Sequence, residues 1–421
     1  MDTQPSRRDF AKTAAVGIAG AALASSIASR AYAGGDDVIK VGLIGCGGRG
    51  TGAASQALHA DKNVKLTAIG DAFSDRLEES LTTLKKECGD KVAIESDHKF
   101  TGWDAYKQVI DSGVDVVVMA QPPHFRPAHL KYAVEKGKHV FAEKPVAVDA
   151  PGVRSVLATC EEAKKKNLSI VSGLCWRYHN GKRETIKRCQ EGGIGDIVAM
   201  QVTYNTGKLK HYPRQPEWSD MEWQVRNWTY FTWGSGDFIV EQHVHSLDKA
   251  AWVMGEYPVK ATGTGGRQVR TGAEFGHIYD HFDTVYEFAN GVKCFSACRQ
   301  IMNCDNDVSD HFYGTKGHCD VFKHQIIGEK PWRFTEKETN MYQVEHDELF
   351  ASIRSGKPIN NGDYMAKSTM MAILGRMSAY TGKTITWEQA MNSKEDLTPP
   401  KYEWGSIGVP PVAMPGVTKF V

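Results

Sequence analysis

The chain of 421 residues is 41% hydrophobic and 24% charged, with 51 Lys and Arg residues against 50 Asp and Glu residues. These proportions exclude a disordered, collagen-like or small disulfide-rich protein. The length fits two domains, and the lack of a basic excess argues against nucleic-acid binding. The nine cysteines contain no Cys-x-x-Cys pair, so we expect neither a zinc ribbon nor a disulfide framework.

Residues 1–33 have the organisation of a twin-arginine export signal. Arg7 and Arg8 lie in the pattern Ser-Arg-Arg-Asp-Phe-Ala-Lys, an apolar run extends from 13 to about 27, and Ala31-Tyr32-Ala33 offers a cleavage site. The alternative is a membrane anchor, but the run is shorter than the ~20 strongly apolar residues of a spanning helix. We therefore expect the twin-arginine export machinery as a partner, a periplasmic location and no stable membrane insertion.

A dinucleotide-binding motif follows this segment. A β-branched strand at 38–44 leads into Gly45-Cys46-Gly47-Gly48-Arg49-Gly50 and then into a helical pattern. The glycines permit a tight turn and a close approach to a pyrophosphate, and the helix N-terminus attracts its charge. Asp71 ends the next strand, at the position where a carboxylate binds the adenosine ribose and repels a 2′-phosphate. The motif predicts NAD as the cofactor, although Arg76 could soften the preference over NADP.

Three more apolar strands, at 114–119, 138–142 and 168–173, predict a parallel sheet. Gln121 and Pro122 follow the first of them, and Glu143 and Lys144 follow the second. Ligands bind beyond the carboxyl ends of such strands, so these four residues are predicted on the cofactor side. An alternative role for Lys144 is a structural ion pair with Glu143.

With these motifs, the chain resembles the Gfo/Idh/MocA family of oxidoreductases. The residues that carry the resemblance are the glycine loop with Asp71, the block Gly-Lys-His-Val-x-x-Glu-Lys-Pro at 137–145, and Gly234-x-Gly236-x-x-x-x-Glu241-x-x-x-His245-x-x-Asp248. Shorter matches lie at 192–197 and 356–358. The chain departs from the common family pattern at Gln121, where a threonine is usual, and at Glu241, where many members have aspartate.

The resemblance implies an α/β protein with an N-terminal Rossmann domain and a C-terminal α/β domain whose large, open, mostly antiparallel sheet carries the substrate. It also implies a homo-oligomer, dimer or tetramer. We place the Rossmann domain at 34–178, the substrate domain at 179–398 and a proline-rich arm at 399–421. Within the second domain, Asn290-Gly291 between alternating runs predicts a hairpin, and 364–380 predicts a helix.

Lys144, His245 and Glu241 are the candidate catalytic residues, and all three are expected to contact substrate. A hydroxyl oxidation needs a base, for which histidine is suited, and a cation beside the developing alkoxide. The family match selects His245 over His243, and Glu241 could orient its imidazole from position i−4. Alternatives are a histidine satisfied within the core, or a metal cluster formed by Glu241, His243, His245 and Asp248; we expect no metal.

The resemblance implies further site residues: Trp176 and Arg177 beside the cofactor and Tyr178 beside the substrate. The alternative is a core tryptophan followed by a surface arginine. Four tryptophans at intervals of five, together with tyrosines and basic residues, lie between 208 and 233. Aromatic faces pack on sugar rings, so Arg226 and Trp228 are predicted to bind substrate from a loop, with a core or interface cluster as the alternative.

The sequence leaves three functions open. The first is an NAD-dependent oxidoreductase acting on a small carbohydrate or polyol, with the cofactor tightly bound. The second is a redox-neutral glycosidase, lyase or epimerase that oxidises its sugar transiently, a mechanism known among NAD-dependent glycosidases. The third is a non-catalytic protein that binds sugar or NAD, which Lys144 and His245 together argue against.

Overall fold

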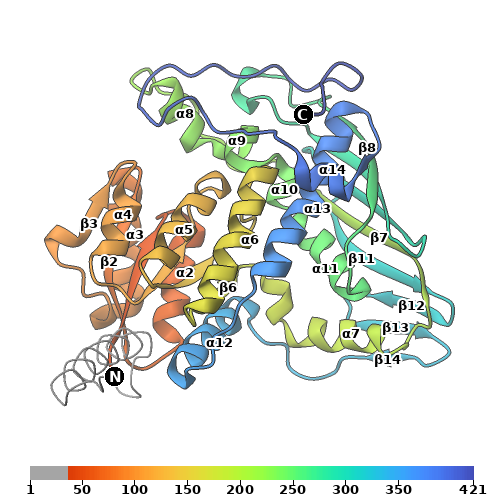
Figure 1. Ribbon diagram of the computed structural model, residues 1–421, viewed down its shortest axis with the longest axis horizontal. Helices are drawn as coiled ribbons and strands as arrows, with labels where there is room; N and C mark the ends of the chain where they lie inside the picture. Colours follow the sequence, from red (N-terminus) through yellow and green to blue (C-terminus); the bar gives the residue numbers. More distant parts are fainter. Residues whose placement is uncertain (1–36) are drawn as a thin grey trace, which may run out of the picture.

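The computed structural model describes residues 37–421, so the export signal predicted at 1–33 lies outside the described residues. Two sheets organise the chain, a six-stranded sheet near the N-terminus and a nine-stranded sheet from the later residues (Figure 1). Within residues 37–421 no helix is both long enough and apolar enough to cross a membrane.

The first sheet is parallel and has the strand order β3-β2-β1-β4-β5-β6. Its strands are β1 (Ile39–Ile44), β2 (Val64–Asp71), β3 (Lys99–Thr101), β4 (Val116–Met119), β5 (His139–Ala142) and β6 (Ile170–Ser172). All residues of β4, β5 and β6 are buried, because helices cover both faces of the sheet. This confirms the predicted Rossmann fold.

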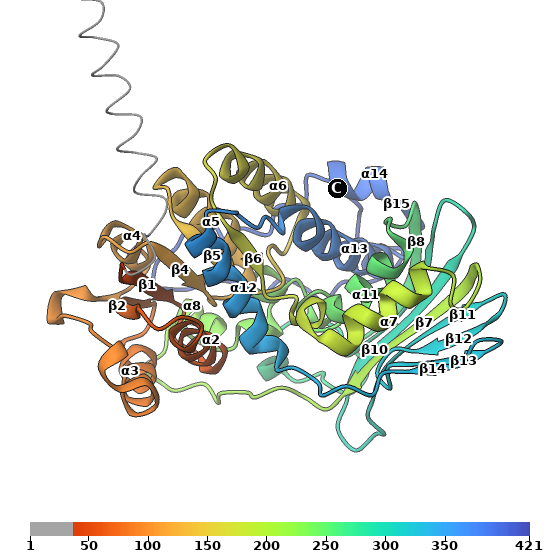
Figure 2. The same ribbon diagram turned by 90° about the horizontal axis from the view of Figure 1, so that it is seen from below.

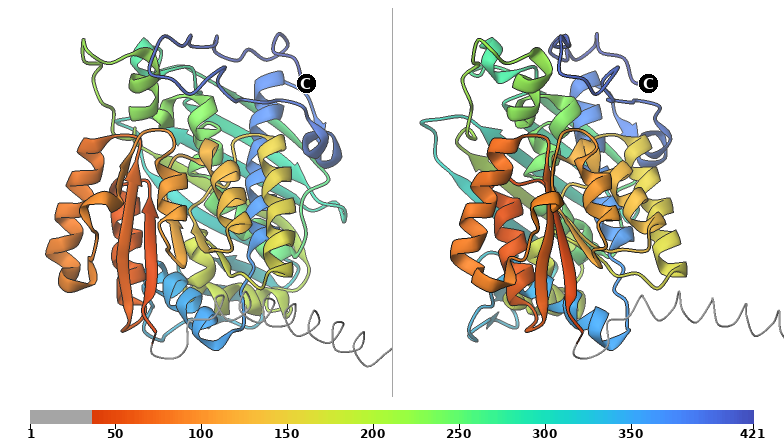
Figure 3. Two further views of the ribbon diagram at one scale, coloured as in Figure 1. Left: turned by 60° about the vertical axis from the view of Figure 1, so that its left-hand side comes forward. Right: turned by 90° about the vertical axis from the view of Figure 1, so that its left-hand side faces the viewer.

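The covering helices are α2 (Gly48–His59), α3 (Ser74–Cys88), α4 (Ala105–Asp111), α5 (Arg126–Glu135) and α6 (Ala150–Lys165). Figure 3 shows them on either side of the strands. The start of α6 is fixed by Asp149, whose carboxylate accepts the Gly152 amide at 2.8 Å. Because β5 and α6 are joined by residues 143–149, this cap also positions the segment that contains Lys144.

The second sheet has the order β14-β13-β12-β11-β7-β10-β9-β8-β15, and every neighbouring pair except β7 and β10 is antiparallel. Its strands are β7 (Ile197–Thr206), β8 (Lys260–Gly266), β9 (His281–Glu287), β10 (Lys293–Gln300), β11 (Asp307–Gly314), β12 (Gly317–Asp320), β13 (Gln325–Gly328), β14 (Trp332–Arg333) and β15 (Ile385–Thr386). The predicted Asn290-Gly291 hairpin joins β9 to β10, which confirms that prediction.

Helices cover one face of this sheet, as Figure 2 shows. They include α7 (Asn180–Gln190), α10 (Phe238–Glu241), α11 (Val244–Met254) and α13 (Gly362–Thr381), and α14 (Trp387–Asn392) follows β15. Strands β9 and β10 alternate between buried and more exposed residues, as expected for a sheet covered on one face. Helix α13, predicted at 364–380, is buried on nearly all sides because it packs between α6 and β8.

One helix of the later sequence returns to the first domain. Helix α12 (Met341–Ser355) packs against α2 and β6, and its Leu349, Phe350 and Ile353 belong to the same core as β1 and β2. The Rossmann core is therefore completed by residues more than 150 positions beyond β6. This return also brings Glu345, on the same helix, towards the glycine loop.

Candidate active site

The glycine loop has the close packing and the open space that a dinucleotide requires. Gly45 has φ +92°, and a Cβ on Gly50 would lie 1.8 Å from the Gly45 carbonyl oxygen. By contrast, a Cβ on Gly47 or Gly48 would meet no atom within 4 Å. These two glycines leave room at the N-terminus of α2, where amides and the helix dipole favour a pyrophosphate. The loop residues therefore fit the predicted cofactor.

A cavity of about 310 Å³ extends from this loop. Its lining includes all four motif glycines, Arg49, Asp71, Gln121 and Pro122, which the sequence assigned to the cofactor. Asp71 is held in place by its two oxygens, which accept the Cys46 amide at 2.6 Å and the Phe73 amide at 2.9 Å. Burial raises the pKa of Asp71, and these amides partly oppose that rise. The carboxylate thus lies at the strand end where an adenosine ribose would bind.

The tryptophan-rich segment covers this cavity, whereas the sequence analysis placed it beside a sugar. Arg226 and Trp228 line the cavity together with Tyr212. Arg226 donates to Asp75 at 2.9 Å, and its guanidinium lies 3.9 Å from the centre of the Phe73 ring. Both Asp75 and Phe73 belong to the Rossmann domain, so the structure brings Arg226 to the cofactor cavity.

The expectation of a loop over this segment is wrong. Short helices α8 (Asp220–Arg226) and α9 (Thr232–Ser235) form because Ser219 caps the first of them and accepts the Glu222 amide at 3.2 Å. Trp223 and Trp233 are buried in a small core with Tyr230. Half of the four tryptophans are therefore core residues, as the alternative interpretation of the cluster held.

The C-terminal arm, residues 399–421, packs over the side of the molecule that contains α8 and α9. Figure 1 shows it crossing α8 and α9, and the Gly405 carbonyl accepts the Met221 amide at 3.0 Å. The Trp404 ring lies 4.4 Å from that of Trp103, measured between centroids, and Trp103 lines the cavity. Next to it, the Tyr402 hydroxyl is 2.8 Å from Nε2 of His124. The arm thus supports the aromatic wall of the cavity from outside.

Lys144 and Glu241 meet where the two domains join. Lys144 follows β5, and its Nζ lies 3.0 Å from Oε1 of Glu241 and 2.5 Å from the Glu241 carbonyl oxygen. Burial lowers the pKa of Lys144, but Glu241 and Glu143 outweigh it and raise the pKa above its usual value. Lys144 is therefore a cation in the folded protein. The alternative, in which Lys144 pairs with Glu143 alone, does not hold because the ammonium contacts Glu241.

His243 and His245 lie in different surroundings. His243 is fully buried, with Nε2 2.7 Å from the Ser296 hydroxyl, so it is a core histidine. His245 is half-buried on the first turn of α11, and burial followed by the charges of Lys144 and Lys249 lowers its pKa well below 6.5. His245 is thus neutral and electrostatically coupled to Lys144.

Two polar atoms at this point are buried and have no hydrogen-bond partner among residues 37–421: Oε2 of Glu241 and Nδ1 of His245. A buried polar atom without a partner is costly. Each could instead bind a substrate hydroxyl. The side-chain amide of Gln121, on the cofactor cavity, is buried and unpartnered in the same way. The alternative metal cluster does not form, because His243 and Asp248 have other partners.

Arg49 forms ion pairs with two carboxylates, one from the segment after β5 and one from α12. It donates to Glu143, and its second amino group lies 2.6 Å from Oε1 of Glu345 on α12. Burial raises the pKa of Glu345, although Arg49 opposes this. The sequence did not predict Glu345, nor Tyr204 on β7. Burial raises the pKa of Tyr204, Lys144 opposes that rise and Glu241 adds to it. No local motif marks either residue.

Three predicted contacts next to β6 have other roles in the structure. Tyr178 is 3% exposed and donates to Asn361 at 2.7 Å, so its assignment to substrate is wrong because the ring is a core element. Arg177 forms a two-pronged pair with Asp248, with its Nε 2.9 Å from Oδ2. Trp176 is partly exposed and packs edge-on against Phe322. The structure thus keeps Arg177 and Trp176 close to the site but partnered within the protein.

The sequence matches two family descriptions along its length. Residues 39–171 match "Oxidoreductase family, NAD-binding Rossmann fold", and residues 183–320 match "GFO/IDH/MocA C-terminal domain".

The chain belongs to the Gfo/Idh/MocA family.

Several curated relatives in this family have different activities. The chain is 23% identical to inositol 2-dehydrogenase of Rhizobium meliloti over 66% of its own length and 74% of the relative's. It is 26% identical to 2,7-anhydro-N-acetylneuraminate hydratase of Escherichia coli, over 51% and 53%, and 27% identical to a glycosyl hydrolase family 109 protein of Phocaeicola vulgatus, over 61% and 50%. The chain therefore spans about half the length of these last two relatives.

Solved structures share the fold. Scyllo-inositol dehydrogenase from Lactobacillus casei, crystallised with NAD(H) and scyllo-inositol, gives a TM-score of 0.64 at 17% identity, covering 83% of this chain and 99% of that one. Aldose-aldose oxidoreductase from Caulobacter crescentus gives 0.65 at 19% identity, with the same coverage. As a Gfo/Idh/MocA protein, the chain has an NAD-binding Rossmann domain and a second domain with a mixed, mostly antiparallel sheet.

The arm should slow the release of bound cofactor. We expect Trp404→Ala to raise the dissociation rate of NADH by roughly 2- to 10-fold, equivalent to the loss of aromatic pairing worth about 0.5–1.5 kcal/mol. Stopped-flow fluorescence with excess NAD as competitor would measure the rate. Trp404→Phe, which keeps a ring against Trp103, is the matched control. An unchanged rate in Trp404→Ala would show that the arm has no part in retaining the cofactor.

Proposed function

We propose that the protein is an NAD-dependent oxidoreductase that transfers a hydride between the cofactor and a hydroxyl-bearing carbon of a small carbohydrate or polyol. The observation that carries this proposal is the grouping of a charged lysine, a neutral histidine and a carboxylate. These three residues do not line the cofactor cavity themselves, but Glu143, adjacent to Lys144, accepts a hydrogen bond from Arg49 of the cavity lining. Lys144 provides the cation, His245 the base and Glu241 an acceptor for a hydroxyl. The dehydrogenases among the relatives support the same class of reaction.

His245 is the residue that removes the hydroxyl proton. Its lowered pKa keeps the imidazole neutral, and the buried Nδ1 has no partner within the described chain, so this nitrogen can accept the proton. The ammonium of Lys144 would stabilise the alkoxide as the proton leaves, because a fixed cation in a buried site acts more strongly than one in water.

Glu241 and the cofactor-side residues provide orientation. Oε1 of Glu241 holds Lys144, and the unpartnered Oε2 can bind a second substrate hydroxyl. NAD, when bound, accepts the hydride. Gln121 lies on the cofactor cavity with an unpartnered side-chain amide, which can bind the cofactor. Arg49 also lines this cavity, but its guanidinium donates to Glu143, Gln56 and Glu345, so its role is to hold the glycine loop in place.

A redox-neutral reaction is the second candidate, in which the sugar is oxidised, cleaved or epimerised, and reduced again. Two observations favour it. Relatives include a hydratase and glycosyl hydrolase family 109 proteins. In addition, α8 lines the cofactor cavity and the arm packs against α8 and Trp103 from outside, an arrangement that suits a resident NAD. The residues would act in the same way, with His245 also returning its proton.

Export and assembly are part of the proposal. The twin-arginine pattern at 1–33 supports transport to the periplasm with the cofactor already in place, since that route carries folded proteins. A homo-oligomer, dimer or tetramer, is proposed from the family resemblance. An exported enzyme that keeps its NAD needs no external nicotinamide pool.

Removal of either catalytic group should abolish turnover without emptying the cofactor site. We expect Lys144→Met to lower kcat by about 100- to 1000-fold and His245→Asn by about 100- to 10,000-fold. NAD affinity, measured by calorimetry, should remain close to that of the wild type. Lys138→Met is a matched control, because Lys138 lies at the opposite end of β5 and bonds the Val114 carbonyl. Turnover within threefold of wild type in either catalytic variant would refute that residue's role.

The pH profile should show the low pKa of the base. Burial and the charges of Lys144, Lys249 and Arg49 disfavour the imidazolium form of His245, so its pKa lies well below 6.5. The neutral, active form is then present above that pKa, so kcat/KM should stay constant as the pH falls to 6.5 and should decrease only at lower pH. An acid limb centred at or above pH 6.5 in the wild-type profile would argue against His245 as the base.

The state of the cofactor during one turnover separates the two candidate reactions. The native protein should contain close to one NAD per chain, measured after acid release. Mixed with a substrate alone, an oxidoreductase leaves its NADH reduced until a second acceptor is added. A redox-neutral enzyme shows NADH transiently and releases product without any acceptor. A protein that purifies empty and binds NAD loosely would contradict the resident cofactor.

A further inference from the structure

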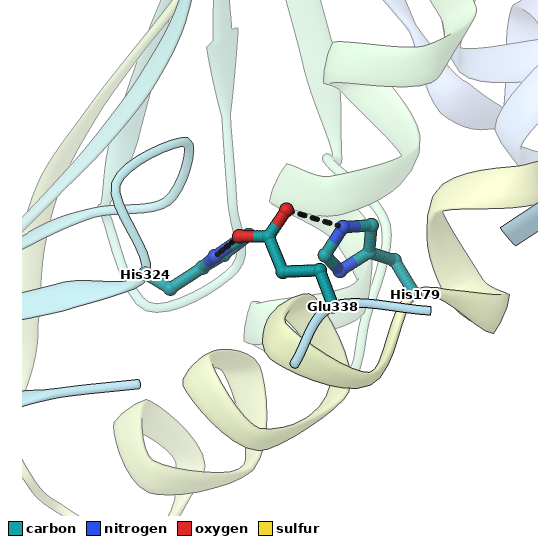
Figure 4. Close-up of side chains that lie close together, drawn as sticks. All are labelled: His179, His324 and Glu338. Carbon is teal, nitrogen blue, oxygen red and sulfur yellow. Dashed lines mark ion pairs between the residues drawn. The ribbon is translucent and has the colours of Figure 1, made fainter. Parts of the chain in front are cut away.

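Three side chains from distant parts of the sequence converge at a place the proposed reaction does not use. His179 precedes α7, His324 lies in the turn between β12 and β13, and Glu338 lies between β14 and α12. Figure 4 shows the carboxylate between the two imidazole rings. Its Oε1 is 3.0 Å from Nδ1 of His324, and its Oε2 is 3.5 Å from Nε2 of His179.

The position of His324 is built into the packing. A Cβ on Gly181 would lie 2.9 Å from Nδ1 of His324, so the ring rests directly on the first turn of α7. Glycine inside a helix is unfavourable unless something requires it, and here the approach of the ring requires it. His324 itself has φ +49°, an uncommon conformation for a non-glycine residue. Both imidazoles are largely buried, with 7% exposure for His179 and 4% for His324.

The exposed Glu338 is held by its neighbours along the chain. The Asn180 side chain donates to the Lys337 carbonyl at 2.9 Å and accepts the Thr339 amide at 3.1 Å. The residues on both sides of Glu338 are therefore fixed to the start of α7, one position after His179. This arrangement keeps the carboxylate at the two rings although its side chain is 57% exposed.

Two imidazoles and one carboxylate are a donor set that zinc prefers, with water in the fourth position. The three donor atoms lie within 4.8 Å of one another. Zinc–ligand bonds of about 2.0–2.2 Å in a tetrahedral arrangement require donor atoms roughly 3.3–3.5 Å apart. The Glu338 carboxylate oxygens lie 3.0 Å from Nδ1 of His324 and 3.5 Å from Nε2 of His179, so small side-chain adjustments would suffice. We propose that His179, His324 and Glu338 form a binding site for a divalent transition-metal ion, Zn²⁺, independent of the redox site.

The charges around this site predict how two substitutions will change its affinity for a metal ion. Lys182 Nζ is 3.1 Å from Nε2 of His324. Burial, followed by the charge of Lys249, lowers the pKa of Lys182 to about 7. Its ammonium form opposes a dication on the other side of the ring. The next cation, Lys249, is paired with Asp310 at 2.5 Å. Removal of the Lys182 charge should therefore tighten metal binding, whereas removal of the Glu338 charge should weaken it.

A bound ion would cross-link three segments of the fold. It would join the start of α7 and the β12–β13 turn to the chain that leads into α12, which completes the Rossmann core. Because the three donors meet only in the folded chain, zinc should stabilise the native state and raise Tm.

The experiment uses the full chain without a histidine tag, stripped with a chelator and dialysed. Calorimetric titration with Zn²⁺, and metal analysis after gel filtration, should give one zinc per chain and a rise in Tm. Co²⁺ in its place should show the intense visible absorption of tetrahedral coordination. His324→Asn and Glu338→Gln should each weaken Zn²⁺ binding at least tenfold, and Lys182→Met should strengthen it.

Matched controls and the opposing outcome are available in the same chain. Glu336→Gln, on the same segment, and His318→Asn, on β12, should leave the affinity unchanged. Glu338 is exposed, so Glu338→Gln should fold, which circular dichroism would check. The proposal is overturned if the wild type takes up no more than trace zinc, or if the double variant His179→Asn/Glu338→Gln binds it as tightly. The three residues would then be an ion-pair cluster only.

Discussion

Lys144 extends from the end of the Rossmann sheet, and its ammonium is held by Glu241 of the second domain. A buried charge is tolerated only with good partners, since desolvation costs several kcal/mol for each ion. Glu241 supplies a carboxylate and a main-chain carbonyl, and Glu143 adds negative charge. The ammonium of Lys144 therefore has its stabilising partners only when both domains are in place, and the proposed site depends on that contact.

Much of the first domain could be predicted because its signals are local. The glycine loop, Asp71 and the apolar strands lie within about a hundred residues, and their order dictates a parallel sheet with a ligand at its carboxyl edge. Lys144 was placed on the cofactor side by the strand order, whereas Glu241 and His245 were selected through the resemblance to a family. Their convergence could not be derived from spacing, because it depends on how two domains pack.

The contacts that sequence reasoning missed or misplaced share one cause. Glu345 contacts Arg49 because α12 packs against the Rossmann core, and no motif near Glu345 in the sequence predicts this packing. Tyr178 was assigned to the substrate through the family resemblance, yet its ring is buried in the Rossmann core and its hydroxyl donates to Asn361, another late residue. Trp228 has the chemistry to pack on a sugar, but a flat aromatic face suits a nucleotide base equally, and the fold places it at the cofactor cavity.

Helix α13 has a consequence for how the two domains can move. It contacts α6 of one domain and β8 of the other, in the region seen in Figures 1 and 2. Nearly all of its residues are buried. A hinge motion that separated the domains would expose this apolar helix to water, at a cost that grows with the area uncovered. Rigid opening and closing of the two halves is therefore disfavoured. The distance between the cofactor edge and Glu241 is therefore set when the protein folds. A substrate of the proposed reaction would bind to a preorganised site and would need no later domain closure to orient it.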